Sequence, residues 1–136
     1  MSSVLLDTCA ILFIADNRAI SPIARDRIIA AAAGGGLYVS PVSAWEIGLL
    51  SSKGRVQFRP DPKTWFNTFA ANPGIRVAAL TSDIAIESCF LPPPLHGDPA
   101  DRLLIATARH LGIPIVTRDR KILDYGAAGL IGAVAC

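Results

Sequence analysis

Short runs of branched apolar residues alternate along this chain with longer segments that have the composition of helices. The runs are Ser3 to Asp7, Leu37 to Val39, Ile75 to Leu80, Ile113 to Thr117 and Leu130 to Ala135. None of them alternates strictly between apolar and polar residues, which is typical of strands buried on both faces of a parallel sheet. The expected order is β-α-α-β-α-α-β-α-α-β-α-β. It predicts a three-layer α/β/α domain with a central parallel sheet of four to five strands.

Most of the predicted helices begin with a recognisable capping residue. Four begin with Ser or Asp followed by proline: Ser21-Pro22, Ser40-Pro41, Asp61-Pro62 and Asp98-Pro99. The Ser or Asp side chain accepts a hydrogen bond from a backbone N–H that has no partner within the helix, and proline has the φ angle that the first turn needs. Thr8 is predicted to cap a helix over residues 8–16, and another helix is predicted to begin at Thr81. The glycines predicted to end helices are Gly34, Gly54, Gly74 and Gly112.

Composition narrows the class of protein. A chain of 136 residues fits a single domain, which we expect to span residues 1–136. Charged residues make up 18%, against about 25% in an average domain, so a disordered chain is excluded and an additional apolar surface is expected. The net charge of +2 is too small to establish nucleic-acid binding.

The same composition predicts a cytoplasmic protein that does not enter a membrane. The chain has no apolar stretch of about 18 residues, and Asp7 interrupts its only early apolar run, so neither a membrane span nor a signal peptide is expected. Cys9, Cys89 and Cys136 form no Cys-x-x-Cys pair, which favours reduced thiols over a disulfide framework or a zinc site.

Two carboxylates stand at the ends of predicted strands. Asp7 ends the first strand and Asp119 follows the strand Ile113–Thr117. Ligands of open α/β sheets bind beyond the carboxyl ends of the strands, so both side chains are expected at the binding edge. Each could equally be a turn or helix-cap aspartate.

Two further carboxylates lie on the apolar faces of predicted helices. Glu46, on the helix Pro41–Lys53, has Val42, Leu49 and Leu50 as its helical neighbours. A buried carboxylate needs a compensating partner, either a metal ion or a distant Arg or Lys. Asp101 shares a face with Leu104, Ile105 and Ala108. Asp98 and Asp101 also resemble a capping box; we interpret Asp98 mainly as the cap and Asp101 as a site residue.

Asp7, Glu46, Asp101 and Asp119 are therefore predicted to converge. An all-oxygen acidic cluster suits Mg²⁺ or Mn²⁺, and such ions activate water for displacement at phosphorus. The chain has no Gly-x-Ser-x-Gly, P-loop or His-Glu-x-x-His motif. His96 and His110 are interpreted as structural or solvated, Cys9 as a packing residue, and Trp45 and Trp65 as helix-packing residues rather than base-stacking ones.

These residues lie in four segments that resemble the acidic motifs of PIN domains, and above all those of VapC-like ribonucleases from toxin–antitoxin pairs. The segments are Leu5–Leu12, Ser43–Gly48, His96–Ala108 and Val116–Asp119, and the resemblance extends from Val4 to about Gly129. It implies a metal-dependent RNA endonuclease whose acidic site is Asp7, Glu46, Asp101 and Asp119. Asp98 matches an additional acid, possible as a further metal ligand, and Thr117 matches a supporting Thr or Ser. The resemblance also implies a homodimer and a small antitoxin that covers the site.

Several expectations concern partners and alternatives. Arg102, Arg118, Arg120 and Lys121 flank the acids in sequence and are candidates for binding RNA phosphates. The apolar residues Ile11, Phe13, Ile14, Ile20, Ile23, Ile28 and Ile29 cannot all enter one core, so some are predicted to form an exposed groove for an antitoxin helix. The alternative functions are a non-catalytic binding module on the same scaffold and a phosphotransfer domain with Asp7 as acceptor.

Overall fold

The computed structural model describes residues 2–94 and 97–136, so the interpretation of His96 lies outside the described residues. Five strands occur in this part of the chain: β1 (Val4–Leu6), β2 (Leu37–Val39), β3 (Ile75–Val77), β4 (Ile115–Thr117) and β5 (Ala133–Ala135). Its helices are α1 (Thr8–Ala15), α2 (Pro22–Ala33), α3 (Pro41–Ser52), α4 (Pro62–Ala70), α5 (Ser82–Glu87), α6 (Pro99–Leu111) and α7 (Arg120–Ala127). The order of strands and helices confirms the predicted one.

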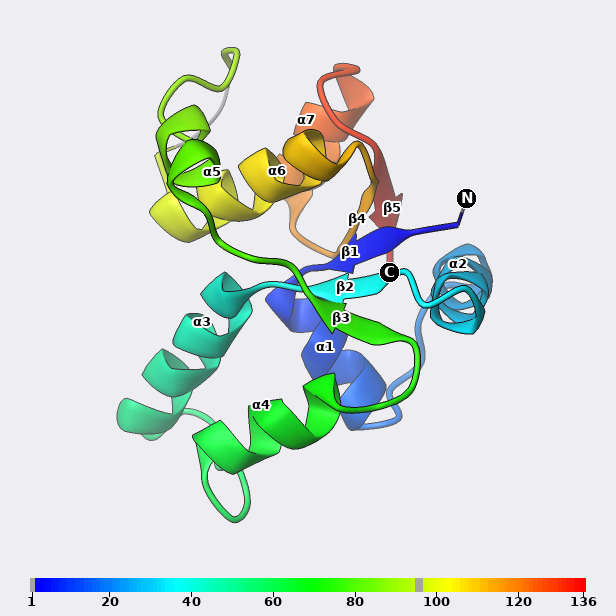
Figure 1. The fold of residues 1–136 in the computed structure, drawn as a ribbon, viewed down its shortest axis with the longest axis vertical. Helices are drawn as coiled ribbons and strands as arrows, with labels where there is room; N and C mark the ends of the chain where they lie inside the picture. The colour runs from blue at the N-terminus through cyan, green and yellow to red at the C-terminus, as the bar shows by residue number, and fades with distance from the viewer. Residues whose placement is uncertain (1, 95–96) are drawn as a thin grey trace.

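The strands form one parallel sheet in the order β3-β2-β1-β4-β5, with β1 in the centre (Figure 1). Leu5 of β1 lies opposite Tyr38 on one side and opposite Ile115 on the other. Because every strand runs in the same direction, the residues that follow β1, β2 and β4 all emerge at one edge of the sheet. This edge carries Asp7, Ser40 and the segment before α7.

The central strand supplies both cores. Val4 and Leu6 pack with residues of α1, α2, α3 and α4, whereas Leu5 packs with residues of α6 and α7. Successive side chains of a strand point to opposite faces, so a fully apolar strand can bury all of its residues between two helical layers. Figure 1 shows α5, α6 and α7 on one side of the sheet and α1, α3 and α4 on the other. The three-layer prediction is therefore confirmed.

The predicted helix caps are confirmed at Ser21, Ser40, Asp61 and Asp98, whose side chains each accept a hydrogen bond from a backbone N–H in the first turn. The prediction for the first helix is wrong by one residue. Asp7, not Thr8, is the cap, and its carboxylate accepts a hydrogen bond from the N–H of Thr8. Thr8 is the first helical residue, which leaves its hydroxyl available for another contact.

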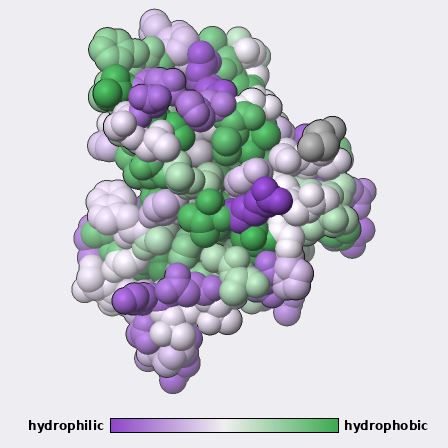
Figure 2. Space-filling view, viewed as in Figure 1, coloured by the Kyte–Doolittle hydropathy of each residue, from purple (hydrophilic) through white to green (hydrophobic). Residues whose placement is uncertain are grey.

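The predicted additional apolar surface is present in part. Ile23 is 70% exposed and Ile29 is 59% exposed, both on α2, whereas Ile11 and Ile28 are buried in the core. Strand β3, helix α5 and the segments beside α5 also expose large apolar side chains, including Val77, Leu80, Ile86 and Phe90. Figure 2 shows that hydrophobic residues on the face it presents lie in separate groups between hydrophilic ones. Within residues 2–94 and 97–136 no helix is long and apolar enough to cross a membrane.

Candidate active site

Asp7 occupies the centre of the site. Its side chain is only 6% exposed, at the carboxyl end of the central strand. The carboxylate accepts hydrogen bonds from the Thr8 N–H (2.7 Å), the Thr117 hydroxyl (2.6 Å) and the Cys9 thiol (3.6 Å). Burial raises the pKa of Asp7, and these three donors oppose that rise. No Lys or Arg in the described residues forms an ion pair with this buried acid, so neutral donors hold it in place.

Thr117 connects Asp7 to Asp119. Its buried hydroxyl donates to Asp7 Oδ2 and accepts a hydrogen bond from the Asp119 N–H over 2.9 Å. Asp119 in turn caps α7, because its Oδ1 accepts from the N–H groups of Lys121 and Ile122. The cap uses one carboxylate oxygen only. Asp119 is therefore both the helix cap and a neighbour of Asp7, so the two alternatives for it are compatible.

Glu46 projects from α3 and is held by the hydroxyl of Thr8. Thr8 Oγ1 donates to Glu46 Oε1 over 2.5 Å and is also hydrogen-bonded to Ser43 Oγ at 2.9 Å. Burial raises the pKa of Glu46, the Thr8 hydroxyl opposes the rise, and the charges of Asp7, Asp98 and Asp119 add to it. Within the described residues no Arg or Lys forms an ion pair with Glu46, so the alternative of a basic partner is not supported.

Asp101 lies among the other acids. Asp98 caps α6 by accepting the N–H of Asp101 (3.1 Å), which confirms its predicted capping role. Burial raises the pKa of Asp101 to about 7, and the charges of Asp98, Asp119, Asp7 and Glu46, in decreasing order, add to the rise. All four acids thus influence the same carboxylate, although they come from four separate parts of the chain.

The arrangement of the carboxylates suits a cation that keeps part of its water shell better than one whose ligands all come from the protein. In the part of the chain that the structure describes, no three acidic, histidine or cysteine side chains are grouped so that they alone could hold an ion. The predicted ligand set of Asp7, Glu46, Asp101 and Asp119 stays a prediction. Mg²⁺ commonly retains several waters and uses one or two carboxylates together with phosphate oxygens of the substrate. The donor set is all-oxygen and anionic, as such an ion requires.

The four basic candidates for RNA contact fall into two groups. The guanidinium of Arg118 donates to the carbonyl oxygens of Cys136 (2.8 Å) and Ala19 (3.5 Å) and lies over the Phe13 ring. Arg102 Nε donates to the carbonyl of Ser88 (3.0 Å). Both side chains donate to backbone carbonyls of distant segments, which is a structural role and weakens the case for either as an RNA-binding residue. Arg120 and Lys121 are exposed at the start of α7, and Arg120 forms an exposed ion pair with Asp124 (3.6 Å).

Sequence reasoning missed two hydroxyl groups of the site. Thr8 and Ser43 are buried and orient Glu46. Ser43 precedes Glu46 by three positions, a spacing that places the two side chains on one helix face. That spacing is the local signal for Ser43 in the sequence. Cys9 also contacts Asp7. Its hydrogen bond with Cys136, its burial and the charge of Asp7 raise the pKa of its thiol, so the thiol stays neutral, in agreement with its interpretation as a packing residue.

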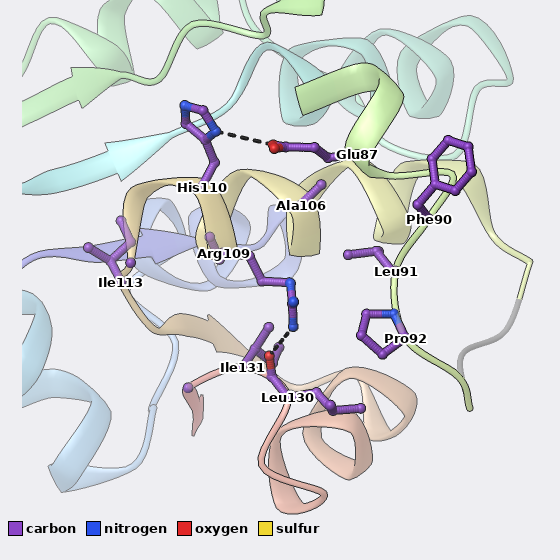
Figure 3. A pocket seen from close by; sticks show the side chains of 13 residues that line it. Glu87, Phe90, Leu91, Pro92, Ala106, Arg109, His110, Ile113, Leu130 and Ile131 are labelled. Carbon is purple, nitrogen blue, oxygen red and sulfur yellow. Dashed lines mark hydrogen bonds and ion pairs between the residues drawn. The ribbon is translucent and has the colours of Figure 1, made fainter. Parts of the chain in front are cut away.

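Two of the hollows in the described part of the chain are similar in size. One, of about 520 Å³, adjoins the acids and is lined by Thr8, Glu46 and Asp98 among others. The other, of about 530 Å³, lies at the C-terminal end of α6 and has none of the site acids in its lining. Figure 3 shows this second pocket, with His110 bonded to Glu87 and Arg109 donating to the Leu130 carbonyl. His110 is thus an exposed helix-end residue, as predicted.

In metal-free protein, stability is expected to fall as the pH rises from about 4 to about 7. An ordinary aspartate has lost its proton by about pH 4 in the unfolded chain, whereas folded Asp101 keeps its proton up to about pH 7. The folded state binds more protons in this window, so raising the pH favours unfolding. Asp101→Asn should flatten the profile, measured as unfolding midpoints in EDTA across that range. An unchanged slope in the variant would contradict the surroundings assigned to Asp101.

Comparison with known proteins identifies the family. The family model described as PIN domain matches residues 4–128. Ribonuclease VapC22 of Mycobacterium tuberculosis is 33% identical over 89 residues, which are 65% of this chain and 67% of that protein.

Solved structures share the fold. The chain is similar to one in VapBC2 of Rickettsia felis bound to a DNA fragment from their promoter (TM-score 0.69, 12% identity, 97% of both chains). It is also similar to one in a toxin–antitoxin complex from Klebsiella pneumoniae (TM-score 0.61, 22% identity, 97% of this chain and 96% of that chain). The match over residues 4–128 and the identity to a VapC ribonuclease show that this chain belongs to the PIN-domain family, in its VapC-like branch.

Proposed function

We propose that this protein is a Mg²⁺- or Mn²⁺-dependent endoribonuclease that hydrolyses phosphodiester bonds and acts as the toxin of a toxin–antitoxin pair. The observation that carries the proposal is Asp101, whose pKa is raised to about 7 by burial and by four surrounding carboxylates. Such mutual repulsion is tolerated where a divalent cation neutralises the acids and draws the negatively charged substrate phosphate toward them. The similarity to a ribonuclease of the same family supports the reaction class.

Each acid has a distinct place in the proposed chemistry. Asp7 and Asp119, linked by Thr117, would hold the cation together with Asp101 and Glu46, and Asp98 would be a further ligand. A bound Mg²⁺ or Mn²⁺ would supply an activated water and stabilise charge at phosphorus. The Thr8 hydroxyl holds Glu46 in one orientation, and the Thr117 hydroxyl holds Asp7. Preorganised carboxylates position water better than mobile ones, because no reorganisation is needed during the reaction. Arg120 and Lys121 are proposed to bind RNA phosphates.

The toxin role rests on the exposed apolar residues and on the relatives. Ile23 and Ile29 of α2 are more than half exposed, and an amphipathic helix of an antitoxin is the proposed occupant. Structures of the same fold come from toxin–antitoxin complexes. We also propose a homodimer. The acids argue against a non-catalytic module, since such a module would have no use for them. Both carboxylate oxygens of Asp7 accept hydrogen bonds, which disfavours Asp7 as a phosphoryl acceptor.

The proposal is tested with the purified chain and single-stranded RNA. Cleavage should require Mg²⁺ or Mn²⁺, stop in EDTA and return when the ion is restored. Millimolar Mn²⁺ should also raise the melting temperature, because an ion that binds only the folded state stabilises it. Co-expression with the product of an adjacent short gene should yield a complex that does not cleave. RNA cleavage that continues without a metal ion would contradict the proposed Mg²⁺ or Mn²⁺ dependence. A chain that forms no complex with that gene product would contradict the toxin role.

A further inference from the structure

Trp45 is exposed beside the acids, contrary to the helix-packing role expected from the sequence. It precedes Glu46 on α3, and 57% of its surface is exposed. Trp65 behaves as predicted, because it packs edge-on against Phe58 (4.9 Å between ring centres) and stacks on Phe69 (6.1 Å). Within the described residues no aromatic ring or cation lies on Trp45. The physical reason for the exposure is that Val42 and Ile47 already fill the buried side of α3.

Trp45 lines the hollow of about 520 Å³ that adjoins the acidic site. Thr8, Glu46 and Asp98 line the same hollow, as do Lys53 and Arg55. One groove therefore joins the acids to an exposed indole and to two cations. Lys53 and Arg55 follow α3 closely, and their backbone N–H groups donate to carbonyls of that helix, Lys53 to Leu49 and Ser51 and Arg55 to Leu50. Their exposed side chains form no ion pair within residues 2–94 and 97–136.

This combination has the chemistry of a single-strand binding groove. Exposed aromatic rings stack on nucleobases, and cations beside them follow the phosphate backbone. An apolar protein partner would gain little from two unpaired cations in its binding groove. The bases of a duplex are already stacked and paired with each other, so they are not available to stack on the indole ring of Trp45.

We infer that Trp45 is the stacking platform for a base of single-stranded RNA next to the cleaved phosphate, and that Lys53 and Arg55 bind the phosphates leading away from it. The inference rests on the proposed nuclease function and names the part of the substrate that this groove takes. It makes Trp45 a determinant of RNA binding and of preference for single strands, and it leaves the water and cation chemistry to the acids.

The test uses Trp45 as its own reporter. In a chain carrying Asp7→Asn, to prevent cleavage, and Trp65→Phe, Trp45 is the only tryptophan. Addition of a single-stranded oligoribonucleotide of roughly 12 nucleotides should quench its fluorescence, and an oligomer of abasic nucleotides should not. Trp45→Ala should weaken binding between about 5-fold and about 100-fold by fluorescence anisotropy of labelled RNA, whereas Trp45→Phe should retain most of the affinity. Phe90→Ala is the matched control, because Phe90 is 80% exposed but lies outside this groove.

Salt dependence tests the two cations. Replacing Lys53 or Arg55 by glutamine should lower the slope of log affinity against log salt by about 0.7 each. If RNA binds without quenching Trp45, or binds equally well to Trp45→Ala, the inference is overturned. The proposed function still stands in that case, provided that the parent chain cleaves RNA. A parent chain that neither binds nor cleaves RNA would overturn both. A Trp45→Ala chain that binds RNA normally but loses its antitoxin would assign the groove to the protein partner and overturn the inference.

Discussion

Replacing Asp7 by asparagine is expected to reduce RNA cleavage by at least about a thousandfold while the chain keeps its fold. The substitution removes one negative charge from the centre of the acid cluster, which weakens the cation and displaces the water it holds. Charge stabilisation by a bound ion contributes several kcal/mol to such reactions, which corresponds to this factor. Asparagine retains the size of the side chain and one oxygen for the Thr8 N–H. Removing a buried charge favours the metal-free variant, but the amide nitrogen cannot accept the hydrogen bond from the Thr117 hydroxyl, so its melting temperature should stay close to that of the parent.

Asp98→Asn is the control for this experiment. Asparagine caps helices as well as aspartate does, and Asp98 is exposed at the N-terminus of α6. Its loss of activity should be much smaller than that of Asp7→Asn or Asp101→Asn. The three variants are compared in initial cleavage rates at saturating Mn²⁺ and in melting temperature. If Asp98→Asn is as inactive as Asp101→Asn, the capping role and the metal role are not divided between these residues as proposed.

Gly74→Ala is expected to cost about 2–5 kcal/mol of unfolding free energy. Gly74 precedes β3 with a φ angle of +87°, in the left-handed region, which costs a residue with a side chain about 1–2 kcal/mol. A methyl group there would also collide with the backbone of Ala32, lying 2.8 Å from its carbonyl carbon and 2.9 Å from its Cα. Relieving that overlap requires movement of β3 or of the end of α2, and overpacking of this kind costs a further 1–3 kcal/mol or so. Urea unfolding measures the loss.

Gly54→Ala separates the two contributions. Gly54 has a φ angle of +67°, but no atom lies within 4 Å of the position that its Cβ would take. Only the backbone term applies, so the expected loss is about 1–2 kcal/mol. Equal losses in the two variants would show that the α2–β3 contact yields without cost. Gly74 precedes β3 and therefore lies at the edge of the parallel sheet opposite the acids, so the surviving folded fraction of Gly74→Ala should cleave RNA at the parental rate.

The sequence alone determined the order of the elements and the edge on which the acids lie. Apolar runs such as Val4–Leu6 can satisfy their burial only between two helical layers, so their pattern specifies a central parallel strand. The caps at Ser21, Ser40, Asp61 and Asp98 were predictable because a cap depends on residues only a few positions apart. Parallel strands bring their carboxyl ends together, and this places Asp7 and Asp119 at one edge.

The tertiary structure decided which groups hold the acids and which side chains remain in solvent. The bond from Thr117 to Asp7 spans 110 positions, and the bond from Thr8 to Glu46 spans 38, so no local pattern reports them. The guanidinium of Arg118 donates to the carbonyl oxygens of Cys136 and Ala19, two contacts that likewise depend on the folding of distant segments. Trp45 is exposed because other residues of α3 already fill the core. Local sequence determines the helix caps and the apolar pattern of each helix and strand. The direction of a side chain and the partner that it meets depend on how distant elements pack, which only the folded chain defines.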